Sequence, residues 1–291
     1  MRLIAATAFA LAAAFYCGVP GTAFAQDDTS EPGSAAFYNG DSPGAMDVWR
    51  PKADGGDPEA MTNVGMLYNL GLGVKRDYKE AAAWYEKAAQ LGFVLAQFDL
   101  GNLYYDGQGV ARDRKQAARW YLAAAKGGSP KAQLYLAQMY ESGEGVEKNK
   151  ETALGWYQKA ADLELADAQY ELGRKLVFGD GIEPDPVKGP DLVLKAAEHK
   201  FVKAQILMAD CYWRGRGVPK NPIEAYVWAS QAVELAKNQD SKRAQSLFDD
   251  IKSGMNGDQI KAAEIELLAV NPKKKKDTTV DQNGGDTSAP Q

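Results

Sequence analysis

The stretch AQFDLGNLYYDGQGVARDRKQAARWYLAAA, residues 96–125, decides the fold because it holds one complete structural pattern. Its first half places apolar residues such as Ala96 and Leu100 at the spacing of one helix face. Gly107 and Gly109 follow, and glycine suits the backbone of a helix end and a tight turn. The second half returns to helical spacing. The stretch therefore predicts two helices joined by a glycine-rich turn.

The same pattern recurs every 36 residues through most of the chain. Alanines mark the first helix of each unit at Ala60, Ala96, Ala132, Ala168 and Ala204. The second glycine of each turn falls on the same grid, at Gly73, Gly109, Gly145, Gly181 and Gly217. A single helix pair cannot bury both of its faces, so such units must stack on their neighbours. We predict an all-α fold, an α/α superhelical solenoid of five 36-residue helix-turn-helix repeats spanning residues 57–239.

These residues resemble the SEL-one-like repeat family, whose pattern is A-x-x-x-L-G-x-x-Y-x-x-G-x-G-V followed by D-x-x-K-A-x-x-W-Y-x-K-A-A. The second unit carries it at Gly101, Tyr104, Gly107, Gly109, Val110, Asp113, Ala117, Trp120 and Tyr121. The family is similar to tetratricopeptide repeats, so the resemblance implies a binding scaffold or adaptor and no particular chemistry. Cysteine-rich exported members staple each hairpin with a disulfide, whereas stacking alone must hold this chain.

The fourth unit departs from the pattern in its second half. Leu192 and Val193 stand where the first three units have Trp-Tyr, and the loop at residues 182–186 contains two prolines. Proline lacks a backbone donor, so we expect the second helix of this unit to be shortened from its start. Drift in a surface loop would explain the change, and so would a hinge or a partner-specific loop.

The N-terminal 25 residues read as a signal peptide. Met1 and Arg2 precede an apolar run, and the small-residue site Ala23-Phe24-Ala25 follows it. We expect cleavage before Gln26 and a periplasmic or secreted protein. Removal of the signal leaves Cys211 as the only cysteine, which is either buried or offered to a partner. Burial is the expected state.

Both ends of the repeat array carry segments that could close it. Residues 26–56 read as a linker over 26–44 and then a partial N-terminal cap. Residues 240–270 contain two helix-like segments expected to cap the other end. Residues 271–291 are expected to form a disordered tail. Its lysines, Lys273 to Lys276, could contact anionic lipid or a sugar polymer, or could simply aid solubility.

Searches for chemistry yield little. The net charge of -5 argues against nucleic-acid binding, which needs a concentrated basic surface. His199 is the one histidine, and a half-exposed loop position suits it better than catalysis. The G-x-S-x-G string at residues 40–44 lacks the strand and helix of a nucleophile elbow. We predict no enzyme activity, no cofactor, no metal site and no integral membrane span.

Candidate binding residues come from the first helices, which line the concave face of tetratricopeptide arrays. Three of their positions, three residues apart, vary from unit to unit as a partner-facing stripe would. The candidates are Asp99, Asn102, Tyr105, Tyr135, Gln138, Glu141, Glu171, Arg174, Asp210 and Trp213. The aromatic members have the composition of an interaction hot spot. Solvated surface, or packing between units, is the other interpretation of the same variation.

The sequence therefore predicts an exported interaction scaffold that binds a protein or peptide in a concave groove and acts in envelope signalling or assembly. The alternative is a protein that binds peptidoglycan or exopolysaccharide, or one with a hydrolase-like activity of the β-lactamase type. A glycan partner thus stays open beside a protein partner.

Overall fold

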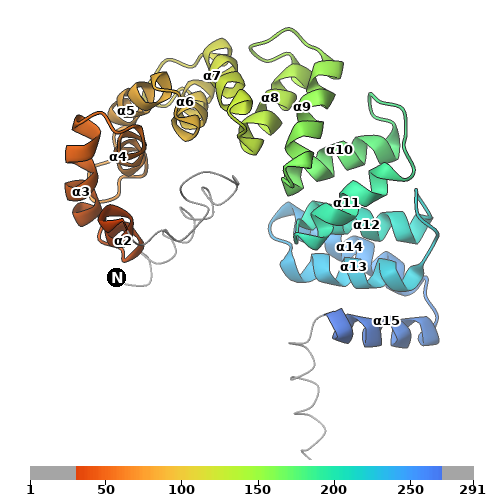
Figure 1. Ribbon diagram of the computed structural model, residues 1–291. Helices are drawn as coiled ribbons and strands as arrows, with labels where there is room; N and C mark the ends of the chain where they lie inside the picture. The colour runs from red at the N-terminus through yellow and green to blue at the C-terminus, as the bar shows by residue number, and fades with distance from the viewer. Residues whose placement is uncertain (1–30, 271–291) are drawn as a thin grey trace, which may run out of the picture. The chain divides into compact units, whose positions relative to one another are not determined.

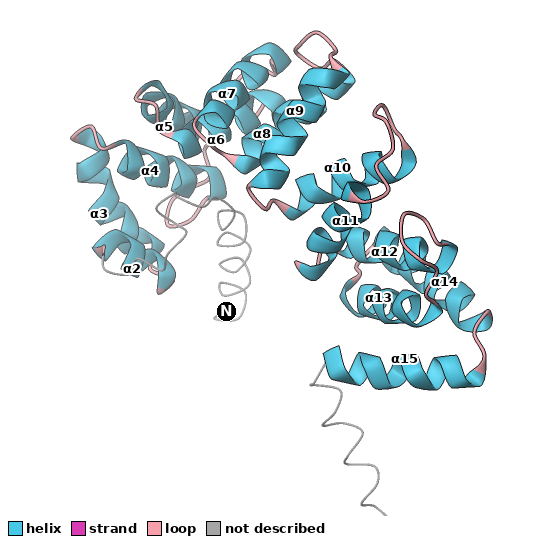
Figure 2. Cartoon of the chain, turned by 45° about the vertical axis from the view of Figure 1, so that its right-hand side comes forward, coloured by secondary structure: helices cyan, strands magenta, loops and turns pink. Residues whose placement is uncertain are grey.

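The computed structural model describes residues 31–270 of the chain, and these residues form fourteen helices joined by loops, with no strand among them (Figures 1 and 2). The predicted signal peptide and lysine-containing tail lie outside this range. Each repeat consists of an A helix, a glycine-rich turn and a B helix, as the α/α solenoid prediction requires. The chain divides into two compact units, unit 1 at residues 1–168 and unit 2 at residues 169–291.

Unit 1 stacks its helical hairpins in chain order, each A helix packing on the B helix before it and the B helix after it (Figure 1). Its helices are α2 (Pro32–Tyr38), α3 (Ser42–Asp54), α4 (Pro58–Leu70), α5 (Tyr78–Gln90), α6 (Val94–Asp106), α7 (Arg114–Lys126), α8 (Pro130–Ser142) and α9 (Lys150–Asp162).

Unit 2 begins within the next A helix and ends with two helices that follow the last repeat. Its helices are α10 (Ala166–Phe178), α11 (Lys188–Glu198), α12 (Val202–Arg214), α13 (Pro222–Leu235), α14 (Gln239–Ser253) and α15 (Gly257–Val270). Helix α14 packs against α12 and α13, and α15 packs against α13. Ile251, Met255 and Ala263 are buried in this contact, so the last two helices cover the apolar end of the array.

The glycine-rich turn explains why the repeat keeps its length. Gly107 ends α6 in the left-handed conformation, with φ of 75°. At Gly109, φ is 71°, and a Cβ atom would lie 2.1 Å from the carbonyl oxygen of Tyr78 at the start of α5. The turn therefore rests on the backbone of the preceding B helix, where only glycine fits. Asp113 then caps α7 by accepting hydrogen bonds from two backbone N–H groups.

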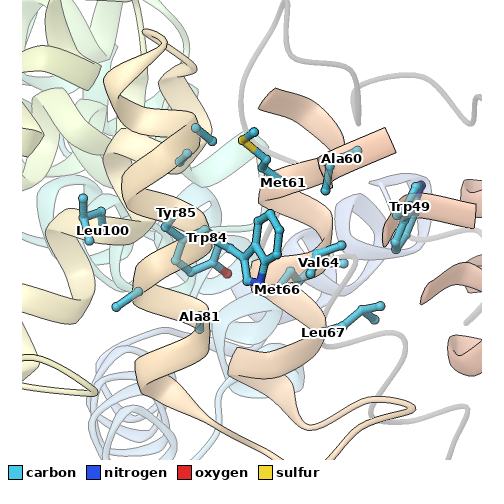
Figure 3. Packing of buried hydrophobic residues seen from close by; sticks show 14 of the residues in the cluster. Trp49, Ala60, Met61, Val64, Met66, Leu67, Ala81, Trp84, Tyr85 and Leu100 are labelled. Carbon is cyan, nitrogen blue, oxygen red and sulfur yellow. The ribbon is translucent and has the colours of Figure 1, made fainter. Parts of the chain in front are cut away.

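Buried side chains of α3, α4, α5 and α6 form the core at the N-terminal end of unit 1 (Figure 3). Where the B helix has a large aromatic residue, the facing residue of the A helix is a glycine. The ring of Tyr85 fills the space that a Cβ on Gly65 would need, and the ring of Tyr121 does the same at Gly101. A side chain on either glycine would come within 2.8 Å of the ring. The small-residue positions thus admit an aromatic ring between the two helices of a hairpin.

A glutamine that is half-buried at Gln97 and buried at Gln133 and Gln205 joins successive repeats in both units. The side-chain amide nitrogens of Gln97, Gln133 and Gln205 donate to the carbonyl oxygens of Ala89, Ala125 and Ala197, respectively, at 3.2, 3.1 and 3.3 Å. Each carbonyl lies in the last turn of a B helix, where the backbone has no partner within the helix. This hydrogen bond therefore fixes how an A helix follows the B helix before it.

The fourth repeat shows the predicted effect of its prolines. Helix α11 has 11 residues against 13 in α5, α7 and α9, and it begins only at Lys188. Asp185 nevertheless keeps its place on the grid, and its side chain accepts hydrogen bonds from the backbone N–H groups of Val187 and Lys188. The cap has survived while the first turn of the helix has been lost.

The N-terminal segment differs from the expected linker, because residues 32–38 form helix α2. Phe37 is buried and its ring lies 5.7 Å from that of Trp49 on α3. Glu31 accepts a hydrogen bond from the indole N–H of Trp49 at 3.2 Å and pairs with Lys52. One buried aromatic and one carboxylate thus hold a segment whose overall composition is that of a loop.

Helix α3 is a complete B helix, where the sequence suggested only a fragment. Asp41, Ser42, Ala45 and Trp49 stand 36 residues before Asp77, Tyr78, Ala81 and Tyr85. Asp41 caps the helix, and the turn at Gly73 rests on its first residues. The array therefore begins with the second half of a further repeat.

The two single residues that the sequence analysis singled out are not part of any site. Cys211 is a free, fully buried thiol on α12, as expected, and burial raises its pKa to about 11. His199 is exposed just after the end of α11. Among residues 31–270, no helix combines the length and apolar character that crossing a membrane requires.

Candidate binding site

The ten predicted residues all lie on A helices. Six belong to unit 1, on α6 and α8, and four belong to unit 2, on α10 and α12. Only three of them, Tyr105, Tyr135 and Gln138, come together around one hollow, which has a volume of about 200 Å³. Met139, Ser142 and Glu144 complete its lining. We call this site the tyrosine hollow.

A cluster of packed aromatic rings holds Tyr135, which lines the tyrosine hollow. Tyr121 is fully buried and its ring stacks on that of Tyr135, with centroids 5.5 Å apart and an angle of 25° between the planes. Phe98 lies 5.7 Å from Tyr135 and 5.8 Å from Tyr121. Tyr135 itself is 38% exposed. The cluster is thus rooted in the core and presents one ring to solvent.

Asn102 holds Tyr121 of this aromatic cluster and does not line the hollow. Its side-chain oxygen accepts a hydrogen bond of 2.7 Å from the hydroxyl of Tyr121. Glu141 has the equivalent task one repeat later, because it accepts a hydrogen bond of 2.8 Å from the hydroxyl of Tyr157. Asp99 is half-buried and also lies outside the lining. These three predicted residues are therefore occupied within their own hairpins or set apart from the hollow.

Arg114 and Glu144 fix Tyr105 on the other side of the hollow. The guanidinium of Arg114 lies 3.3 Å from the centroid of the Tyr105 ring and donates to the Tyr105 carbonyl oxygen at 2.8 Å. The Tyr105 hydroxyl donates to Glu144 Oε2 at 3.1 Å, and Arg114 Nε lies 3.4 Å from the same oxygen. A stacked cation and a shared carboxylate thus hold the ring in one orientation.

The phenol groups of the hollow stay neutral at physiological pH. Burial raises the pKa of Tyr121 far above its usual value, and burial followed by the hydrogen bond to Glu144 raises that of Tyr105. The pKa of Tyr135 is raised by burial and then by the charges of Asp167 and Asp106. The hollow therefore offers aromatic faces, hydroxyl groups and a carboxylate, which suit recognition of a ligand.

In unit 2, the predicted residues pair with one another and with nearby charges. Arg174 lies 3.4 Å from Glu171 and 3.3 Å from Asp180, and Asp210 pairs with Arg214 and Arg216. None of the four lines the tyrosine hollow or the hollow that residues of α13 and α14 form in this unit. Ion pairs that stay partly open to solvent in this way contribute little to binding or stability.

Trp213 was predicted as an interaction hot spot, but it packs against the C-terminal cap. A Cβ on Gly254, just after α14, would lie 2.7 Å from its ring, and Lys220 lies 5.2 Å from the ring centroid. Trp213 lies on an A helix as predicted, but the sequence did not reveal that the segment after α14 packs against its ring.

Sequence reasoning missed Glu144, although a signal for it exists. It stands between the two glycines of a turn, where the five repeats have Leu72, Gln108, Glu144, Asp180 and Arg216. In three repeats this residue contacts a predicted A-helix residue: Glu144 contacts Tyr105, Asp180 contacts Arg174, and Arg216 contacts Asp210. This position varies inside an otherwise fixed turn and contacts the variable A-helix positions, so it is a further variable column of the repeat.

Comparisons with known proteins agree with this architecture. The Sel1 repeat family model matches residues 58–93, 94–129, 130–165, 166–201 and 202–237. No curated protein matches the chain.

Several solved structures are similar to the chain. The crystal structure of a Sel1 repeat protein from Oxalobacter formigenes is 27% identical, covers 78% of this chain and 97% of that chain, and has a TM-score of 0.66. A protective antigen of uropathogenic Escherichia coli with an SLR fold is 23% identical, with coverages of 97% and 75% and a TM-score of 0.36. An immunity protein from Pseudomonas aeruginosa is 20% identical, with coverages of 85% and 82% and a TM-score of 0.41. On the five family-model matches, which span most of the chain, this protein belongs to the Sel1 repeat family.

Proposed function

We propose that this protein is an exported scaffold that holds a protein partner at the tyrosine hollow of unit 1. Sel1 repeat proteins generally mediate protein–protein interaction, and this chain has five such repeats. The observation that carries the proposal is the exposed ring of Tyr135, which is rigidly supported by Tyr121 and flanked by Tyr105 and Gln138. Rigid tyrosines beside polar groups are typical of the residues that dominate binding energy at protein interfaces.

The export half of the proposal rests on the N-terminal sequence. The charged start, the apolar run and the small-residue site at Ala23-Phe24-Ala25 are those of a cleaved signal peptide. An exported scaffold without chemistry of its own fits a role in envelope signalling or in assembly of an envelope machine.

A photo-cross-linker at Gln138 tests the binding site in the native envelope. Gln138 lines the hollow and is exposed, so a reactive side chain there leaves the core unchanged. The matched control is Glu86, an exposed residue on the B helix α5. We expect a discrete protein adduct at Gln138 and none at Glu86. No adduct at Gln138, or one that disappears on digestion of peptidoglycan or polysaccharide, would contradict a protein partner at this site.

Affinity for the captured partner gives the second test. Replacement Tyr135→Ala should weaken binding by about 2 kcal/mol, because it removes a rigid aromatic contact. Leu163→Ala is the control, since Leu163 is also in unit 1 and has the same 38% exposure. Equal losses for the two variants would show that the tyrosine hollow is not the binding site.

A further inference from the structure

We propose that the tyrosine hollow receives one cationic side chain of the partner, an arginine or a lysine, seated on the ring of Tyr135 beside the carboxylate of Glu144. The inference rests on the proposed function, because it names the chemistry that the scaffold recognises at that same site.

The size of the hollow suits one side chain. Its volume of about 200 Å³ is below the range of roughly 300–1,000 Å³ that encloses a small-molecule ligand. Its lining comes from the middle and the C-terminal half of α8, the end of α6 and the turn after α8. An extended segment of a partner could therefore cross the surface and insert one residue.

Among the described residues, the Tyr135 ring has no cation of its own, whereas several other aromatic rings of unit 1 have one. Lys87 lies 4.0 Å from the ring centroid of Trp84, Lys159 lies 4.1 Å from that of Trp156, and Arg114 lies 3.3 Å from that of Tyr105. Within residues 31–270, no lysine or arginine stacks on Tyr135, although its neighbour Tyr121 is stacked beneath it. A cation over an aromatic face is a recurring contact of this repeat, and at Tyr135, an exposed ring that lines the hollow, the partner can supply it.

The charges around Tyr135 favour a cation. Every charge that shifts its pKa is negative: Asp167 and Asp106 both raise it after burial has done so. Glu144 adds a carboxylate to the lining, and its side chain is 47% exposed. An arriving guanidinium or ammonium group would thus meet attraction from three carboxylates.

Arg114 contacts two lining residues of the hollow but does not fill the proposed position. Its guanidinium lies on the ring of Tyr105, and its Nε contacts Oε2 of Glu144. Tyr105 donates to that same oxygen, so both contacts use Oε2. No donor among the described residues is paired with Oε1, which can accept a hydrogen bond from the partner's side chain. The Arg114–Tyr105–Glu144 group also shows that a guanidinium can stack on a tyrosine and reach this carboxylate together.

Two capped peptides that differ only in charge test the inference on the full mature chain. The probes are acetyl-Gly-Arg-Gly-amide and its citrulline counterpart, which has almost the same shape without the positive charge. Binding is followed by NMR of ring-labelled tyrosines, with the Tyr135 signal identified by its loss in Tyr135→Phe. We expect the arginine peptide to shift the Tyr135 and Tyr105 signals in a saturable manner and the citrulline peptide to shift them several-fold less.

Variants locate the contribution of each group. Tyr135→Leu keeps an apolar side chain but removes the aromatic face, and it should weaken arginine binding by about twofold to fivefold. Glu144→Gln should weaken it by a similar factor. Glu86→Gln removes an exposed carboxylate outside the hollow and should leave binding unchanged. Circular dichroism confirms that each variant is folded. Equal binding of the two peptides, or an equal effect of Glu86→Gln and Glu144→Gln, would overturn the inference.

The outcome separates this inference from the proposed function. If a partner cross-links at Gln138 while arginine and citrulline peptides bind alike, the scaffold role is supported and the inferred binding of a cationic side chain is wrong. If the arginine peptide binds selectively while no protein cross-links, the hollow binds a cationic side chain and the scaffold role is wrong.

Discussion

Units 1 and 2 share one repeat but use the same B-helix position differently. The grid position filled by Trp49, Tyr85, Tyr121 and Tyr157 in unit 1 is filled by Val193 and Ala229 in unit 2. All four aromatic side chains are almost fully buried, and at Gly65 and Gly101 the facing A-helix residue has no side chain. We call these four residues the aromatic column. In unit 1 their buried rings therefore pack against the A helix and support the residues on its surface.

The consequence appears on the A-helix surfaces. In unit 1, Tyr121 stacks on Tyr135 and the tyrosine hollow results. In unit 2, Val193 packs on Gly173, and the surface residues Arg174 and Asp210 pair with charges nearby. The difference teaches that a buried position decides whether an exposed residue of this fold has a rigid support. The binding surface therefore depends on which side chains are buried inside the hairpin.

Removal of one aromatic side chain should have the largest effect and should distinguish the stabilities of the two units. We expect Tyr121→Ala to destabilise unit 1 by about 3–5 kcal/mol, because it empties a fully buried aromatic site. Val193→Ala should destabilise unit 2 by only about 1–2 kcal/mol, since fewer buried carbon atoms are lost. Urea unfolding followed by hydrogen exchange in each unit measures both, because repeat arrays need not unfold in one step. Equal losses would show that the aromatic column does not set the two units apart.

A second comparison concerns the turns. Gly109→Ala should cost about 3 kcal/mol or more, because alanine is strained at a φ of 71° and its Cβ would meet the backbone of Tyr78. Gly217→Ala in unit 2 should cost less, since its Cβ would meet the ring of Pro190 at 2.6 Å, which can shift more easily than backbone.

Gly128 supplies the control for strain alone. Its φ is 90° and nothing lies within 4 Å of the Cβ position, so Gly128→Ala should cost about 1 kcal/mol. Thermal unfolding of the three variants gives the order. A cost at Gly128 equal to that at Gly109 would mean that backbone strain, and not the contact with the preceding helix, explains the glycine grid.

The smallest expected effect is a pH dependence of opposite sign at the two ends of the array. Burial tends to raise the pKa of Glu31, but hydrogen bonds from Lys52, Ser34 and Trp49 outweigh it and hold the pKa below 4.5. The stabilisation of α2 is thus complete above the unfolded pKa and is lost as the pH falls through the lower folded value.

At the other end, burial and then the charge of Glu266 raise the pKa of Glu224. The contact of α15 with α13 should therefore be strongest in acid and weaken as the pH rises through the folded pKa of Glu224. Hydrogen exchange of α2 and α15 between pH 6 and pH 3, corrected for the intrinsic rate, measures both. Glu31→Gln and Glu224→Gln should flatten the respective profiles, and parallel profiles at the two ends would refute the assignment.

Much of the fold could be predicted because a strict period constrains it. The positions of Ala96 and Gly109 recur every 36 residues: Ala96 is fully buried, and a Cβ at Gly109 would meet the backbone of Tyr78. The shortened α11 followed from Pro184 and Pro186 for an equally local reason. In contrast, α2 depends on the tertiary contact of Phe37 with Trp49, which no local pattern reveals.

The site could be predicted only in part. Variation along the A helices identified Tyr105, Tyr135 and Gln138, because residues that the fold does not need are free to differ. The same criterion also selected Asn102 and Trp213, whose partners Tyr121 and Gly254 lie on other elements. Whether a variable residue faces solvent or a neighbour depends on contacts distant in sequence, and periodicity carries no information about those.

The contact between a turn and the preceding B helix has a consequence for how such a chain can change its length. Gly73, Gly109 and Gly145 each rest on the main chain at the start of the preceding B helix, and main-chain atoms are alike in every repeat. A gene segment encoding 36 residues can therefore be duplicated or deleted, and the new junction closes without a matching pair of side chains. Recombination can lengthen the array while substitutions at residues such as Tyr135 independently alter what it recognises.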